Sequence, residues 1–534
     1  MKKLIPYLLI FICFSCDDLF HEEEISIGKI ESVAELESAV NGLYGLLAHA
    51  IQDNDGLSFR AINLKGDDII LGNADYSNYY YDSEEYYCWT YSGNENYRQD
   101  ANWSNLYHII TSANNIITQF ETRVTLSRQM EELLGEAYFF RAYTYFRLTR
   151  TFGQVPLVKD IDIDYSIPLS SFETIYSFIE KDLEKAKQLL PANSSVTRNP
   201  FYVPHKGTAK ALLAEVYLSW AGYPVKDNLK YARAASEAGE TLDSADYFGF
   251  GLMPDFIHLW EKEYNGNPET VFAIYYADPV QAIAFNEINM VYWGYYQESR
   301  YQGIQTSPNS ACFIPGFSPV EVNFFNDFPD SYRKDITFFT TIYVPDEYPY
   351  YPQIDTGFVH ISTTDICDRI AYRKFYVENT IIRWSDIEEI PFESPLILYM
   401  GNSKIYLLRY AHTLLTYAEA MARSGQLDAS AYEAVNRIRR RANNMYQHAS
   451  SIYDLTPGLS AEAFADSVVQ ERAWELAGEF EGRWFDLVRL EKVEDLPDLR
   501  HPDEGGFPEE AVTKENYFFS IPQEEQYLNP NLSE

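Results

Sequence analysis

The stretch GEAYFFRAYTYFRLTRTFGQVPLV, residues 135–158, decides how this chain folds. From two residues upstream to Gly153 it predicts one long helix that is rich in aromatic side chains. Glu136 and Arg141 lie among these aromatic residues, and charges placed in a helical core in this way are usually buried ion pairs. Gly135 and Gly153 are expected to permit close packing or a left-handed turn.

Other segments show the same helical periodicity. GTAKALLAEVYLSWAG (207–222) aligns apolar residues on one face, and IYLLRYAHTLLTYAEAMARSGQ (405–426) repeats them at helical spacing, with Gly425 as its C-cap. A further helix follows over 431–442, and another is expected over roughly 462–490. Pairs of helices near 102–150, 172–240 and 404–443 resemble tetratricopeptide units, although their spacing is not uniform.

The character of the chain changes between about 245 and 400. Pro, Gly, Asn and Tyr are frequent there, together with short β-prone runs such as TVFAIYYA (270–277) and FFTTIYV (338–344). Long irregular segments inside a compact chain are usually functional. We therefore expect a mainly α fold, in which tetratricopeptide-like helix pairs form a scaffold for a loop-rich, aromatic-rich half that carries short β segments.

The N-terminus has the layout of a lipoprotein signal. Lys2 and Lys3 precede an apolar run, Leu4–Ile12, that is too short to span a bilayer, and a small residue stands before Cys16. Residues 1–15 are thus expected to be a signal peptide, with Cys16 as the lipidated mature N-terminus. The alternative, a redox or metal pair formed by Cys13 and Cys16, lacks both a second ligand pair and a βαβ context.

Charge and cysteine content exclude several classes of protein. The chain has 42 basic and 79 acidic residues, a net charge of −37, and cleavage before Cys16 removes two of the lysines. Such a surface repels nucleic-acid phosphates and anionic lipid headgroups, so a nucleic-acid binder is not expected. Attachment to a membrane would therefore depend on the lipid anchor. Cys88, Cys312 and Cys367 permit at most one disulfide.

The opening stretch closely resembles the G-E-A-x-F-x-R-A-x-x-Y-F-x-L-x-x-x-F-G-x-V-P-L segment of SusD/RagB-type outer-membrane lipoproteins. The resemblance continues in order along the chain, through segments 41–47, 103–117, 207–222, 267–277, 407–443, 471–490 and 518–532. One departure is ELAGEFEGRWFDL (475–487), where the family usually reads closer to E-L-x-F-E-G-x-R-W-F-D-L. The charged motif residues Glu471, Arg472, Arg483 and Asp486, like those of the opening stretch, are expected to be structural.

The resemblance implies one SusD-like domain over residues 16–534, with an N-terminal part at about 20–225 and a C-terminal part at about 260–534. It implies a non-catalytic lipoprotein that captures nutrient glycans without a cofactor and delivers them to a SusC-like TonB-dependent porin of the outer membrane. In that group of proteins, acidic residues directly after the lipidated cysteine accompany display on the cell surface, and Asp17 and Asp18 fit this pattern.

Motifs of catalysis are missing from the sequence. It has no H-E-x-x-H, G-x-S-x-G, G-x-x-x-x-G-K-[ST] or G-x-G-x-x-G pattern, and its nine histidines form no i, i+4 pair. DIDID (160–164) lacks the glycine and glutamate of a calcium-binding EF-hand loop, so it is interpreted as a solvated acidic loop and no metal site is expected.

Sugar capture needs aromatic faces for pyranose C–H groups, and amides, carboxylates or guanidinium groups for the hydroxyls. Segments 75–100 and 289–303 supply both kinds of group. The expected ligand-binding residues are Trp89, Tyr91, Asn94, Asn96, Trp293, Tyr295, Tyr296 and Arg300, with Asp67 and Asp68 as further polar candidates. Alternatively, these tyrosines pack against the porin or cover loops.

Two rival functions stay open at this point. A groove that reads peptide backbone, without an aromatic platform, would indicate a peptide-binding member of the same fold. A carboxylate pair inside the aromatic cleft, with the pKa of one member raised, would indicate a glycoside hydrolase.

Overall fold

The computed structural model describes residues 29–52, 61–69, 97–121, 123, 125–161, 164, 166–192, 202–275, 320–344, 357–360, 370–374, 404–501 and 512–533. Helices dominate these residues, as expected, and the strands are few and short. Within these ranges, no helix combines the length and the apolar character needed to cross a bilayer.

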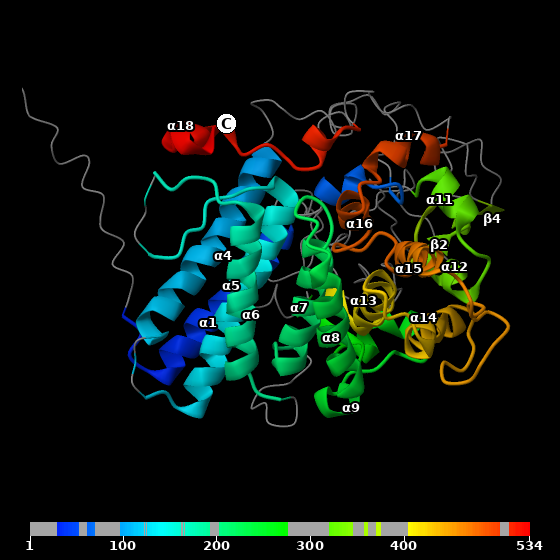
Figure 1. Ribbon diagram of the computed structural model, residues 1–534, viewed down its shortest axis with the longest axis horizontal. Coiled ribbons are helices and arrows are strands. Elements are labelled where there is room, and N and C mark those ends of the chain that lie inside the picture. The colour runs from blue at the N-terminus through cyan, green and yellow to red at the C-terminus, as the bar shows by residue number, and fades with distance from the viewer. Residues whose placement is uncertain are drawn as a thin grey trace, which may run out of the picture.

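Six helices build the N-terminal side of the molecule: α1 (Val33–Gln52), α4 (Tyr97–Glu121), α5 (Arg128–Phe152), α6 (Phe172–Leu189), α7 (Lys206–Trp220) and α8 (Leu229–Asp243). Successive helices pack side by side, and α8 continues the row onto the C-terminal helices (Figure 1). The predicted helix pairs near 102–150 and 172–240 are therefore confirmed.

Helix α5 contains the opening stretch of sequence and is buried almost throughout. Ser127 begins it by accepting the Met130 N–H, and Gly153 ends it with a φ of 78° while donating its N–H to Thr149. Gly135 lies against α6, because a Cβ there would come within 3.0 Å of Leu189 and Leu190. The expected roles of both glycines, close packing and a left-handed turn, are thus confirmed.

The C-terminal side begins with a two-stranded antiparallel ladder between β1 (Thr270–Tyr275) and β6 (Lys404–Arg409). Strand β6 leads directly into α13 (Tyr410–Arg423), which packs against α14 (Ala429–Ala442) and α15 (Ala461–Glu475), and α16 (Arg483–Arg489) follows. Two smaller ladders pair β2 (Phe338–Phe339) with β5 (Ala371–Tyr372) and β3 (Thr341–Val344) with β4 (Gly357–His360).

Short elements complete the described chain. They are η2 (Ala61–Lys65), α9 (Ala245–Phe248), η4 (Ile257–Leu259), η5 (Lys262–Tyr264), α11 (Val322–Asp327), α12 (Tyr332–Thr337), η10 (Val493–Asp495), α17 (Leu496–Leu499), η12 (Lys514–Asn516), α18 (Gln523–Leu528) and η13 (Pro530–Leu532). The largest cluster of buried apolar side chains runs from Ile30 to Leu532 and draws on both sides of the molecule.

Two helix predictions need correction. The helix expected from residue 405 begins only at Tyr410, because the run before it is strand β6, which is buried along its whole length. The helix expected over roughly 462–490 is interrupted between α15 and α16, where Gly478 takes a φ of 73°. The C-cap prediction at 425 is close, since Ser424 is the cap and Gly425 follows it with a φ of 75°.

Candidate functional site

A buried ionic network joins the turn after α15 to the strands. The Arg409 side chain, which is fully buried, donates to Glu269 at 2.6 Å, to Glu475 at 2.9 Å and to Glu479 at 2.9 Å. Arg441 also reaches Glu269 and Glu475, the first at 2.7 Å. Each carboxylate therefore meets cations from more than one element, which offsets the desolvation of these charges.

The charges of the opening stretch are also paired inside the protein. Arg141 binds both carboxylate oxygens of Asp182 on α6, at 2.7 and 2.8 Å, and donates to the Asn114 amide oxygen on α4 at 2.8 Å. Glu136 accepts the hydroxyl of Tyr44 on α1 at 2.6 Å. The expected structural role of these residues is confirmed.

The charged residues of the last helices complete this pattern. Glu471 pairs with Arg333 at 2.7 Å, Arg472 pairs with Asp486 at 3.0 Å, and Arg483 pairs with Asp67 at 2.6 Å. All of these side chains are at least nine-tenths buried.

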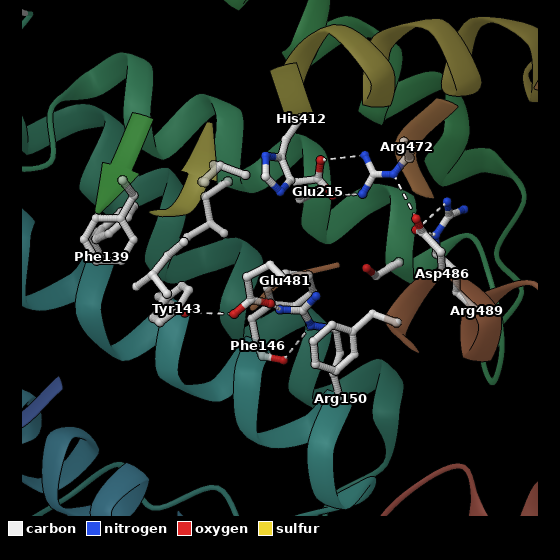
Figure 2. A pocket seen from close by; sticks show the side chains of 16 residues that line it. Phe139, Tyr143, Phe146, Arg150, Glu215, His412, Arg472, Glu481, Asp486 and Arg489 are labelled. Atoms are coloured by element: carbon white, nitrogen blue, oxygen red, sulfur yellow. Dashed lines mark hydrogen bonds and ion pairs between the residues drawn. The ribbon is translucent and has the colours of Figure 1, made fainter. Parts of the chain in front are cut away.

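An interior cavity lies between α5, α7, α13 and the segment around α16 (Figure 2). Its lining residues are Phe139, Tyr143, Phe146, Arg150, Leu212, Glu215, Ser219, Phe272, Leu407, Leu408, His412, Arg472, Glu481, Phe485, Asp486 and Arg489. Burial opposes ionisation of Asp486, but Arg472 and Arg489 hold its pKa below the ordinary value. This carboxyl is therefore the opposite of the acid with a raised pKa that a glycoside hydrolase needs.

A second arrangement, here called the loop junction, comprises residues 67–69, 320–321 and 370–374. Ile69 and Val320 form an antiparallel bridge, and the Val320 N–H donates to the Ile370 carbonyl at 3.0 Å. The Tyr372 hydroxyl donates to the Asp68 carbonyl at 2.8 Å. Ile69 stands before the aromatic segment 75–100 in the sequence, and Val320 stands after segment 289–303. The junction therefore brings together two described positions that flank the candidate segments in the sequence.

Asp67 and Asp68 fasten the loop junction to the turn between α15 and α16. Asp67 binds Arg483 through both oxygens, at 2.6 and 2.8 Å, and Asp68 accepts the Gly478 N–H at 2.8 Å. Burial and the neighbouring Asp67 raise the pKa of Asp68 to about 6. Asp67 and Asp68 are 8% and 3% exposed, and these contacts anchor the junction to the turn; their expected contact with a ligand stays a prediction.

The remaining candidate residues cannot be placed. Trp89, Tyr91, Asn94, Asn96, Trp293, Tyr295, Tyr296 and Arg300 lie outside the described residues, as do Cys16, Cys88, Cys312 and Cys367. In the described part of the acidic segment 160–164, Asp164 accepts the backbone N–H of Ser166. No group of three or more potential metal ligands occurs among the residues that the structure describes.

Sequence reasoning missed the loop junction. The available signal was the pair of aspartates directly before the aromatic segment, in KGDDIILG, together with the arginine of the EGRWFDL motif. The partners Asp67 and Arg483 are 416 residues apart, so neither motif alone indicates the pairing.

Comparisons with known proteins agree with this architecture. A family model described as "Starch-binding associating with outer membrane" matches residues 21–218, and the model of the SusD family matches residues 398–534. A SusD-like protein P2 of Formosa agariphila is 26% identical over 499 residues, which cover 91% of this chain and 90% of that protein.

Solved structures share the fold. A SusD homologue from Bacteroides thetaiotaomicron superposes with a TM-score of 0.73 at 23% identity, covering 95% of this chain and 97% of the other. A structure described as a laminarin-binding SusD-like protein gives a TM-score of 0.70 at 21% identity, covering 94% and 98%. With its two terminal matches, a relative aligned along nearly its whole length and the shared helical fold, the chain belongs to the SusD/RagB family.

Proposed function

We propose that this protein is a non-catalytic glycan-binding lipoprotein of the outer membrane, which captures oligo- or polysaccharide at the cell surface. The observation that carries the proposal is the Ile69–Val320 bridge. It brings Ile69, which stands before segment 75–100 in the sequence, next to Val320, which stands after 289–303, on a scaffold fixed by buried ion pairs. We infer that the two aromatic-rich segments serve one binding surface.

The chemistry of these segments suits sugars. Trp89 and Tyr91 in one segment, and Trp293 with Tyr295 and Tyr296 in the other, offer flat faces for pyranose rings. Asn94, Asn96 and Arg300 supply donors and acceptors for hydroxyl groups. A structural neighbour is described as laminarin-binding, which supports a glycan as the ligand class here.

The cellular setting follows from family membership and the N-terminus. Cleavage before Cys16 would leave a lipid anchor in the outer membrane, and the family description as associating with that membrane supports this location. The partner would be a SusC-like TonB-dependent porin that receives the glycan. We also propose that residues 16–534 form one domain, because the largest apolar cluster contains residues from Ile30 to Leu532.

A binding experiment with residues 17–534 tests the function. The protein is titrated against a panel of polysaccharides by calorimetry, and the mixture is assayed for new reducing ends. We expect binding without cleavage, and at least a tenfold weaker affinity in Trp89→Ala or Trp293→Ala, since stacking on one aromatic ring contributes about 0.5–1.5 kcal/mol beyond the area it buries.

Tyr247→Ala is the matched control, because Tyr247 is a 57% exposed aromatic residue on α9, which lies at the lower edge of Figure 1, away from α16. The affinity of the Tyr247→Ala variant for the glycan should equal that of the unmodified protein. Binding of peptides in place of glycans would favour the peptide-uptake alternative, and release of reducing ends would reveal a hydrolase; either result contradicts the proposal.

A further inference from the structure

The interior cavity joins the two sides of the molecule. Its walls come from α5 and α7 on the N-terminal side and from β6, α13, α15 and α16 on the C-terminal side. All of its lining residues are buried except Arg150, which is partly buried. The cavity is therefore an internal feature of the described scaffold.

One wall presents a polar atom that has no hydrogen-bond partner among the residues that the structure describes. The His412 imidazole is 2% exposed and accepts the backbone N–H of Arg409 at its Nδ1, at 3.0 Å. Because Nδ1 is an acceptor, the neutral ring carries its proton on Nε2. Burial and the nearby Arg409 depress the pKa of His412, which keeps the ring neutral. Nε2 makes no hydrogen bond to any of the described residues. A buried N–H without an acceptor is costly, and proteins usually supply one.

The charged side chains in the wall favour a neutral ligand. Arg150 pairs with Glu481, and Arg472 pairs with both Glu215 and Asp486 (Figure 2). The remaining cation, Arg489, also pairs with Asp486, at 2.8 Å. Every charged side chain in the wall thus already has an opposite charge, so the cavity offers no net charge to hold an ion.

The volume of the cavity limits how many water molecules it can hold. Its water-accessible space is about 20 Å³. One water needs roughly 10–15 Å³ by this measure, together with two to four polar partners. Besides His412 Nε2, the wall contains the Ser219 hydroxyl and the carboxylates of Glu215 and Glu481. Figure 2 shows His412 beside Glu215, on the opposite side of the cavity from Tyr143 and Glu481.

We propose that this cavity is a specific hydration site, in which one or two ordered waters accept the His412 Nε2–H and bridge α13 to the N-terminal helices. The water is part of the fold in the same way as a buried side chain. It completes the hydrogen bonding of a histidine in the first turn of α13 and lets the two sides pack without leaving a buried donor unpaired.

A crystal structure of residues 17–534 at high resolution tests the site directly. We expect a fully occupied water about 2.7–3.2 Å from His412 Nε2. Crystals pressurised with xenon provide a second readout, because dry apolar cavities take up xenon and hydrated polar ones do not. The absence of water density at Nε2, or xenon in its place, would overturn the proposal.

Ser219→Val is the variant that should displace the water, since its two methyl groups occupy the cavity from α7. Ser236→Val on the exposed face of α8 makes the same change in helix propensity without touching the cavity. We expect the water peak to vanish in the first variant and to remain in the second. Retention of the peak in Ser219→Val would contradict the assignment. Glycan affinity should be unchanged in both variants, so this test is independent of the proposed function.

Discussion

Replacing Asp68 by Asn should stabilise the protein near neutral pH, although the change removes a charge next to a buried arginine. Asp68 accepts the Gly478 N–H through a side-chain oxygen, and an asparagine retains such an acceptor. What the substitution removes is the free energy needed to ionise a carboxyl that is buried beside Asp67.

The magnitude follows from the pKa. Burial and the neighbouring Asp67 raise the pKa of Asp68 from 3.8 to about 6. Because the folded state holds this proton more tightly than the unfolded state, the group favours folding below pH 3.8, and that contribution is lost as the pH rises through about 6. Two pKa units correspond to about 3 kcal/mol. Part of this contribution is already lost at pH 4, so the stability of Asp68→Asn relative to the unmodified protein should increase by about 2.4 kcal/mol between pH 4 and pH 7.5.

The assay is urea unfolding followed by tryptophan fluorescence at several pH values, with the difference between variant and parent plotted against pH. Contributions of the other titrating groups cancel in this difference. Asp67→Asn is the matched control, because it leaves Arg483 buried without its bidentate partner and should destabilise the protein by about 3–5 kcal/mol at pH 7.5. A difference for Asp68→Asn that stays flat from pH 4 to 7.5, or that falls with rising pH, would refute the reasoning.

Other substitutions test the scaffold. Arg141→Met leaves Asp182 buried and unpaired, so it should lower the free energy of unfolding by about 3–5 kcal/mol, and adding Asp182→Leu should restore part of the loss in urea unfolding. Failure of the second change to restore stability would contradict the ion-pair explanation. Gly153→Ala should cost at least about 1 kcal/mol, because its φ is 78° and the new methyl group would meet Phe518 at 3.3 Å. Gly42→Ala is the matched control, because Gly42 lies within helix α1 and a Cβ there meets nothing within 4 Å. This substitution should raise the melting temperature, since alanine favours a helix more than glycine does. Equal effects of the two alanine substitutions would refute the explanation from the positive φ of Gly153.

The sequence predicted the helical scaffold well where one face of a helix is apolar. Strand β6 was mistaken for the start of a helix because it is buried on both faces, and a short run of apolar residues has no period that separates strand from helix. The interruption after α15 was missed because its apolar residues continue the helical spacing, whereas the backbone turns at Gly478 to bring Glu479 onto buried cations.

The site was less predictable than the scaffold. Buried charge in the motifs could be recognised from its aromatic surroundings, but the partners could not, since Arg141 meets Asp182 across 41 residues and Arg409 meets Glu269 across 140. Asp67 and Asp68 resembled ligand contacts because acidic residues before an aromatic loop are usually exposed. Only the three-dimensional contact with Arg483 identifies them as anchors.

The turn between α15 and α16 also dictates the order in which the molecule can be completed. Helix α5 buries Arg147, whose guanidinium donates to the Phe480 carbonyl at 3.1 Å and to Glu481 at 3.3 Å, and its Tyr143 donates to the same carboxylate. On the ribosome, α5 is made more than three hundred residues before these acceptors appear. The native contacts of Arg147 with Phe480 and Glu481 can therefore form only after the C-terminal part of the chain has been made.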